Sequence, residues 1–154
     1  MVDFSSPGFK EYSLLTAAKA VISKYAVFSG RATRSEYWYW VLGQGAVLLL
    51  LEMIMTISMI VIFVRNDSQP MPPYEVFMYC LAAGVPLLLW SLATLIPSLA
   101  VTCRRLHDTG RSGTLLLLYL VPLIGGILLL IYCCEDSQRG TNQYGPSEKY
   151  PDLP

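Results

Sequence analysis

Three long apolar runs constrain the fold of this chain more than any other feature of its sequence. They cover residues 38–64, 76–103 and 114–134, and Glu52 is the single charged residue within them. A helix rises about 1.5 Å per residue and the hydrocarbon core of a bilayer is about 30 Å thick, so a run of about 20 residues is long enough to cross it. The sequence therefore predicts an all-α integral membrane protein with three transmembrane helices.

The composition agrees with a membrane environment. Hydrophobic residues make up 54% of the 154 residues and charged residues only 14%, well below the charged share of about 25% in soluble domains. Basic and acidic residues balance at 11 each, so net charge gives no attraction for nucleic acid. Since no linker-like segment or internal repeat interrupts the chain, we expect a single membrane domain over residues 1–154.

Neither a metal site nor a cleavable signal peptide is predicted. The cysteines lack the short paired spacings of a zinc or redox motif, so we expect no metal and no cofactor. The N-terminus has no basic residue before Lys10 and no apolar core, so the first apolar run has to direct insertion. The four cysteines border the apolar runs: Cys80, Cys103, Cys133 and Cys134.

The basic residues indicate an orientation. With three spans and a cytoplasmic N-terminus, eight basic residues lie inside and three outside, as the positive-inside rule requires. The C-terminus is then outside. The aromatic residues 37–40 support this arrangement, because tyrosine and tryptophan rings anchor at the headgroup level.

The third run allows an alternative. Pro122 and the pair Gly125 and Gly126 interrupt it, and proline and glycine can break a helix. A re-entrant hairpin would return the tail to the cytoplasm, whereas a full span would place it outside. We favour the full span.

Residues 9–28 are predicted to contain an amphipathic surface helix, with Ser6 as its N-cap and Pro7 at its first position. Such a helix either lies in the headgroup plane or packs on the cytoplasmic surface of the protein itself. Its apolar face comprises Leu14, Leu15, Ala18, Val21, Ile22, Tyr25 and Ala26.

Two polar segments, 29–38 and 104–113, end up on the same predicted membrane face. They carry five arginines and two acids, a local surplus of three positive charges. Guanidinium groups bind phosphate oxygens, and basic residues near an anionic leaflet gain roughly 1 kcal/mol each. We expect this face to bind anionic lipid headgroups or a partner protein. Its candidate residues are Arg31, Arg34, Glu36, Arg104, Arg105, His107, Asp108 and Arg111.

Two residues in the second segment predict a tight turn. Gly110 can end a helix in the left-handed conformation, and Ser112 can cap the helix that follows. His107 beside Asp108 suggests acid–base catalysis, but neighbouring helical residues point about 100° apart. No nucleophile is identifiable as their partner, so a structural His107 is favoured and an enzyme is the third alternative.

Glu52 supports the second alternative, an oligomeric transporter or channel. An ionisable group within a span is costly and is a functional candidate. Proline residues at 86, 97 and 122 would break helices near a pathway. The simpler interpretation is an interhelical hydrogen bond from Glu52 to Ser91 or Thr94.

Three motifs carry a family resemblance. Residues 25–38, 104–113 and 140–146 resemble the opening, central and closing motifs of the bacterial inner-membrane family called domain of unknown function 805. Thr114 and Leu115 stand where the family usually has aromatic residues, and the segment before Tyr25 is longer than the family's. The closing motif contributes Gly140, Asn142, Tyr144, Gly145 and Pro146.

The resemblance implies a bacterial plasma-membrane protein with several helices, from a family without an established activity or catalytic residues. We expect the chain to act there as an envelope or accessory component. Three full spans would place Asn142 and Tyr144 on the side opposite the arginine segments. A re-entrant third run would instead join all three motifs in one site.

Overall fold

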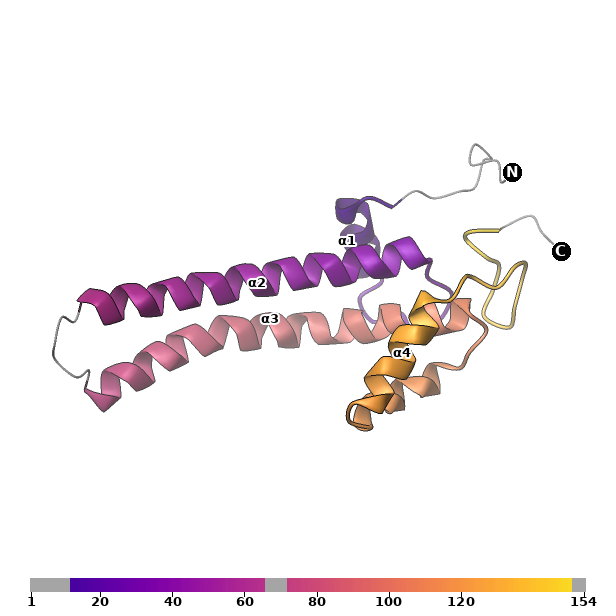
Figure 1. Cartoon of the computed structure of the whole chain (residues 1–154). Helices are drawn as coiled ribbons and strands as arrows, with labels where there is room; N and C mark the ends of the chain where they lie inside the picture. Colours follow the sequence, from indigo (N-terminus) through magenta and orange to yellow (C-terminus); the bar gives the residue numbers. More distant parts are fainter. Residues whose placement is uncertain (1–11, 66–71, 151–154) are drawn as a thin grey trace. The chain divides into compact units, whose positions relative to one another are not determined.

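The computed structural model describes residues 12–65 and 72–150. Its helical elements are shown in Figure 1, and no strand occurs within those two ranges, where Asn142 and Gly145 form an isolated β-bridge. The predicted all-helical class is confirmed for the described residues. The elements are α1 (Leu14–Ser23), α2 (Arg34–Arg65), α3 (Pro73–Asp108), the 3-10 helix η1 (Gly113–Leu120) and α4 (Ile124–Cys134).

The first two apolar runs form the long helices α2 and α3. Both are long and apolar enough to cross a membrane, over Arg34–Val64 and Pro73–Asp108. The hydroxyl of Thr33 accepts a hydrogen bond from the backbone amide of Glu36 and so caps the first turn of α2. Helix α3 starts at Pro73, a favourable first position, and continues through Pro86 and Pro97 without ending.

The third apolar run is not one continuous helix, so the prediction of a single transmembrane helix over 114–134 is wrong. Helix η1 ends at Leu120, and the chain turns through Pro122 and Leu123, whose φ is 64°. Helix α4 then packs against η1, so close that a Cβ at Gly125 would lie 1.7 Å from the carbonyl oxygen of Leu118. Proline ends the first helix and glycine permits the close packing, which together produce a hairpin.

The predicted turn between α3 and the hairpin is confirmed. Gly110 has a φ of 77°, the left-handed conformation that favours glycine. The hydroxyl of Ser112 accepts a hydrogen bond from the backbone amide of Thr114 at the start of η1. Residues within the turn itself, Gly110 and Ser112, therefore set the direction in which the chain leaves α3.

The amphipathic helix is shorter than predicted. Helix α1 starts after Ser13, which forms a reciprocal capping box with Thr16, whereas the predicted cap Ser6 and Pro7 lie outside the described residues. Ala17 and Val21 are fully buried, while Leu15 is 72% exposed. One side of α1 thus packs on the protein, and the other described residues leave an apolar side uncovered.

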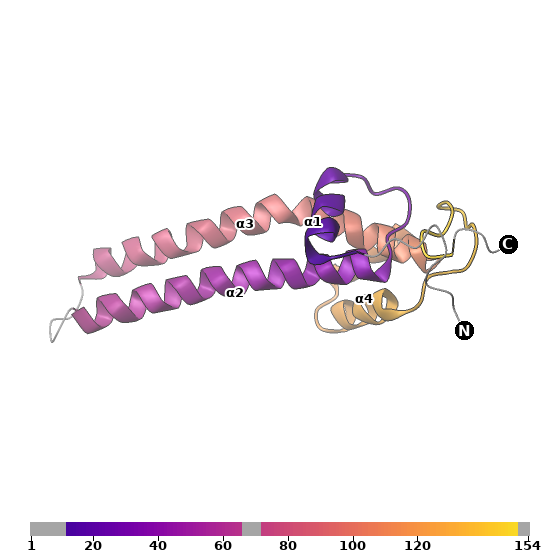
Figure 2. The same cartoon turned by 90° about the horizontal axis from the view of Figure 1, so that it is seen from above.

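Two compact units make up the chain, one formed by Met1–Val41 with Ile96–Pro154 and the other by Leu42–Leu95. The first unit has a buried hydrophobic core to which α1, α2, α3 and α4 all contribute, namely Val21, Ala32, Tyr37, Trp40, Val101 and Cys133. In the second unit, the segments of α2 and α3 run side by side (Figure 2), and the Trp90 indole donates a hydrogen bond to the Gln44 side chain.

Candidate functional site

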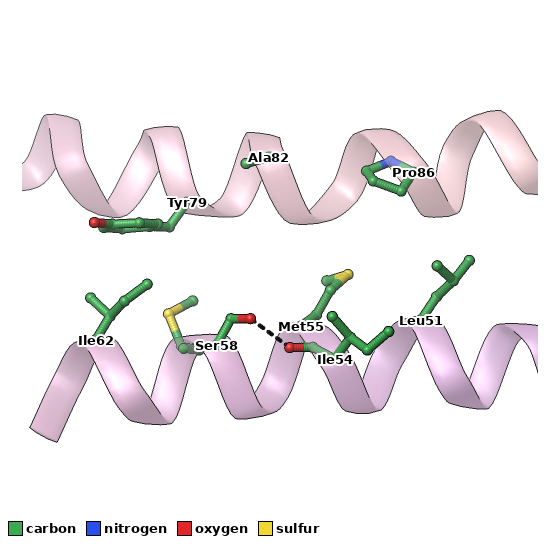
Figure 3. A pocket seen from close by; sticks show the side chains of 9 residues that line it. Leu51, Ile54, Met55, Ser58, Ile62, Tyr79, Ala82 and Pro86 are labelled. Carbon is green, nitrogen blue, oxygen red and sulfur yellow. Dashed lines mark hydrogen bonds between the residues drawn. The ribbon is translucent and has the colours of Figure 1, made fainter.

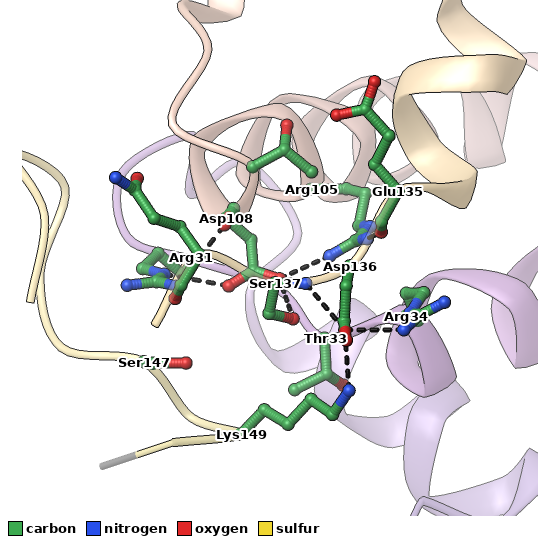
Figure 4. A network of polar contacts seen from close by, with 12 residues as sticks. Arg31, Thr33, Arg34, Arg105, Asp108, Glu135, Asp136, Ser137, Ser147 and Lys149 are labelled. Atoms are coloured by element: carbon green, nitrogen blue, oxygen red, sulfur yellow. Dashed lines mark hydrogen bonds and ion pairs between the residues drawn. The ribbon is translucent and has the colours of Figure 1, made fainter. Parts of the chain in front are cut away.

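Asp108, at the last position of α3, is the centre of the polar cluster in the first unit (Figure 4). Its Oδ1 accepts a hydrogen bond from Arg31 Nε at 2.8 Å. Its Oδ2 accepts hydrogen bonds from an Arg105 guanidinium nitrogen and from the Ser137 hydroxyl. All four side chains are buried. One carboxylate therefore joins the segment before α2, the end of α3 and the segment after α4.

The remaining donors of the two arginines bind backbone carbonyls. Arg31 donates to the carbonyl oxygens of Gln138, Gly140 and Gly145, at 2.5, 2.8 and 3.3 Å. Arg105 donates to the carbonyl oxygen of Cys133 at the end of α4 and to that of Glu135. We call Arg31, Arg105, Asp108 and Ser137 the arginine clamp, because they fix the tail against α3.

The closing motif lies at the same site as the two arginine segments. The Asn142 side chain donates a hydrogen bond to the carbonyl oxygen of His107 at 2.9 Å, and its Oδ1 accepts one from the amide of Tyr144. The Tyr144 ring stacks on His107 with a centroid distance of 3.7 Å. The separation expected for three full spans is therefore wrong, since the hairpin brings the tail back to the end of α3.

His107 is buried and held by contacts from several segments. Its Nδ1 lies 3.1 Å from the carbonyl oxygen of Gly30, and its Nε2 lies 3.6 Å from Cys103 Sγ. A Cβ at Gly113 would lie 2.3 Å from that sulfur, so glycine lets the start of the hairpin cover the pair. Asp108 is engaged with the arginines instead, and this arrangement suits a structural histidine.

A second buried ion pair joins α2 to α3. Arg104 and Glu36 approach to 3.2 Å, with side chains 1% and 0% exposed. The Glu36 oxygens and the terminal Arg104 nitrogens lack a hydrogen bond within the described ranges. Nearby, the Tyr12 hydroxyl donates to Glu148, and burial together with the negative charges of Glu36 and Glu148 raises the pKa of Tyr12. The pair is thus desolvated and held by electrostatics more than by hydrogen bonds.

Only part of the predicted arginine face reaches the surface. Arg34, 41% exposed, pairs with Asp136 at 2.5 Å, and Arg111 pairs with both oxygens of Glu135 at 2.5 and 2.9 Å. Adding these two acids reduces the local positive surplus from three charges to one. Sequence reasoning missed Glu135, Asp136 and Ser137, although their signal was present as polar residues directly after the third run.

Asp136 also accepts hydrogen bonds from Lys149 at 2.6 Å and from the amide of Ser137 at 2.8 Å (Figure 4). Partial burial by itself would raise the pKa of Asp136, but the hydrogen bonds from Lys149, Ser137 and Arg34 outweigh it and hold this pKa well below its ordinary value. The exposed ion pairs of Asp136 with Arg34 and Lys149 therefore help to attach the tail to the start of α2.

The second unit contains an apolar cavity of about 220 Å³ between α2 and α3 (Figure 3). Leu51, Met55, Tyr79 and Pro86 are among its lining residues, and Glu52 is not. The hydroxyl of Thr94, a predicted partner of Glu52, donates to the carbonyl oxygen of Trp90 in its own helix. Glu52 is therefore not part of this cavity.

Comparisons with known proteins agree with the resemblance in the three motifs. The family described as "Protein of unknown function (DUF805)" matches residues 25–146, and the chain belongs to this family. Inner membrane protein YhaI of Escherichia coli K12 is 35% identical over 134 residues, covering 85% of this chain and 93% of the relative. Inner membrane protein YhaH of the same organism is 30% identical over 129 residues, covering 84% and 93%. No solved structure matches the chain.

Proposed function

We propose that this member of the DUF805 family is a non-enzymatic accessory protein of the bacterial inner membrane whose helix α1 binds the anionic surface of the bilayer. The exposed apolar face of α1 carries the proposal. Leu15 and Ile22 are 72 and 58% exposed, although another side of the same helix is fully buried at Ala17 and Val21. An apolar face of this kind is typical of helices that lie in the headgroup region.

The position of a lysine on that face supports the proposal. Leu15, Lys19 and Ile22 are spaced i, i+4 and i+7, so they form one stripe along the helix. Lys19 is exposed and has no ion-pair partner within the described ranges. Its aliphatic stem can lie along the apolar stripe while its ammonium group reaches phosphate oxygens. Lys24, next to the helix, is only loosely paired with Glu148 at 3.6 Å.

The arginine clamp has a supporting role in this proposal. Arg31, Arg104 and Arg105 are buried and engaged with acids or carbonyls, so they hold the surface in shape and leave lipid binding to exposed lysines. Arg34 and Arg111 reach the surface with their charges already paired. Each unpaired lysine near an anionic leaflet gains roughly 1 kcal/mol.

The hairpin also supports a revised topology with two spans, α2 and α3, and both chain ends in the cytoplasm. This arrangement puts ten of the eleven basic residues inside and leaves only Arg65 outside, a stronger asymmetry than three spans give. Helix α1 then lies on the leaflet that carries most of the anionic lipid headgroups.

The test measures the depth of α1 in full-length protein in lipid nanodiscs. The exposed cysteines Cys80 and Cys134 are replaced by alanine, and a fluorophore is attached at Leu15→Cys or Ile22→Cys. Ser23→Cys is the matched control, because Ser23 is exposed on the polar face of the same helix. We expect lipid-borne quenchers to act on positions 15 and 22 much more than on 23, and more strongly with phosphatidylglycerol than with phosphatidylcholine alone.

Two results would refute the proposal. Equal quenching of all three positions by aqueous iodide would show that α1 faces water. Protection of positions 15 and 22 from both lipid-borne and aqueous quenchers, in native membranes only, would assign the face to a partner protein. Lys19→Glu should weaken the increase in lipid-borne quenching that phosphatidylglycerol produces, without changing the melting temperature of the protein.

A further inference from the structure

Glu52 is an exposed carboxyl group near the middle of α2, and no contact among the described residues accounts for it. Its side chain is outside the apolar cavity and forms no hydrogen bond or ion pair with any residue in the described ranges. The helix around it is the most hydrophobic candidate span, with a mean hydropathy of 2.7. Hydrocarbon offers no hydrogen-bonding partner, so a carboxyl group that faces lipid is costly.

The face of α2 that bears Glu52 forms a continuous stripe that the other described residues leave uncovered. Gly45, Leu49, Glu52, Thr56 and Phe63 follow the helical repeat along one stripe. Leu49 is 62% exposed and Phe63 78% exposed, and a Cβ at Gly45 would meet open space. Glycine on such a face permits another helix backbone to approach closely.

We propose that a second copy of this chain covers this face, with the two Glu52 side chains hydrogen-bonded to each other as neutral carboxylic acids. A two-fold axis along the membrane normal places parallel α2 helices side by side and each residue opposite its own copy. A neutral carboxylic acid is both donor and acceptor, so two of them satisfy each other completely. This self-complementarity makes a second copy the occupant that the exposed group fits best.

The chemistry of the hydrogen bond predicts which substitutions preserve the dimer. Glu52→Gln keeps a donor and an acceptor on one side chain and should retain the pair. Glu52→Leu keeps the size and removes both, and it makes the span more hydrophobic, so insertion is not impaired. Loss of the paired hydrogen bonds should lower the dimer-to-monomer ratio roughly fivefold to thirtyfold.

The experiment uses disulfide cross-linking of full-length protein in native membranes, with exposed Cys80 and Cys134 replaced by alanine. Leu49→Cys and Thr56→Cys lie on the Glu52 face. Leu50→Cys and Ile57→Cys are matched controls, since these residues are 59 and 55% exposed but point away from it. We expect homodimer bands at 49 and 56, faint bands at 50 and 57, retention with Glu52→Gln and loss with Glu52→Leu.

Three outcomes would overturn the proposal. Equal cross-linking at all four positions would indicate random collisions, and unchanged cross-linking in Glu52→Leu would remove the role of the carboxyl group. A cross-linked band at 49 and 56 that contains a different protein would show that the occupant is not a second copy. Mass spectrometry of the excised band identifies its content directly.

Discussion

Arg31 Nε lies 2.8 Å from Asp108 Oδ1, although 77 residues separate the two in sequence. Both side chains are almost fully buried, and the same carboxylate also forms an ion pair with Arg105. Removing one partner of a buried ion pair leaves an uncompensated charge in a low-dielectric interior, which typically costs about 3–5 kcal/mol. The clamp around Asp108 is therefore where the attachment of the tail is most sensitive to substitution.

Asp108→Asn is expected to destabilise the first unit by about 3–5 kcal/mol, because Arg31 and Arg105 then share a neutral acceptor. Thermal unfolding of the detergent-solubilised full chain measures the effect. Asp136→Asn is the control: Asp136 also pairs with an arginine, but its side chain is half exposed, so a loss of about 1 kcal/mol or less is expected. Equal losses in the two variants would contradict the central role of Asp108.

Gly125→Ala is expected to disrupt the hairpin, whereas Gly126→Ala is expected to leave it intact. A Cβ at residue 125 would lie 1.7 Å from the Leu118 carbonyl oxygen, while a Cβ at residue 126 meets nothing within 4 Å. Overpacking of this kind costs about 1–3 kcal/mol or more, while alanine in an open helical position gains up to about 1 kcal/mol over glycine. Melting temperatures of the two variants provide the comparison, and a tolerated Gly125→Ala would refute the packing of η1 on α4.

The pair of Glu36 and Arg104 is expected to be replaceable as a unit. Glu36→Leu or Arg104→Leu alone should cost about 3–5 kcal/mol, since each leaves a buried charge. The double substitution should be nearly neutral or stabilising by about 1–4 kcal/mol, because it removes the desolvation cost of both ions. A double-mutant cycle by chemical unfolding measures the coupling. Additive losses in the double variant would contradict the buried pair.

Stability should fall at acidic pH through Asp136. Because its folded-state pKa is depressed below the unfolded value of about 3.9, its contribution is fully present above that value and is lost as pH falls through the lower folded pKa. Melting curves between about pH 7 and about pH 2 should show a smaller acid loss in Asp136→Asn than in the unaltered chain. The difference should be about 1 kcal/mol or less, since the side chain is half exposed. An equal loss of stability at acidic pH in the two proteins would refute the contribution of Asp136.

The proposed two-span topology predicts which residues a membrane-impermeant thiol reagent reaches in intact cells. Asp67→Cys, between α2 and α3, should be labelled. Gln143→Cys, exposed in the tail, should be labelled only after the cells are opened. Exposed native cysteines are replaced first. Labelling of Gln143→Cys in intact cells would restore the third span and place the tail outside.

Local physics made the helices and the turn after α3 predictable from the sequence. The first two apolar runs form α2 and α3 because a long apolar segment in a membrane has to satisfy its backbone hydrogen-bonding groups internally, and a helix does so. Gly110 and Ser112 act on their immediate neighbours, so their roles followed from residue type. The arginines, acids and closing motif could likewise be named as candidates before their contacts were known.

The third run shows where residue type leaves two outcomes open. Pro122 and Gly125 were compatible with an interrupted span or with a hairpin, because a helix break does not specify the direction of the next helix. The close approach of Gly125 to Leu118 decides it, and that contact exists only once η1 and α4 pack.

The membrane-length helices, the family and the polar residues at the helix ends could be predicted from the sequence, because they depend on local hydrophobicity and on short motifs. The packing of distant segments is what pairs Asp108 with two arginines, pairs Glu135 and Asp136 with two more, and leaves Glu52 exposed. Such pairings depend on which distant segments meet, and the free energy of a buried charge depends on the partner it finds there.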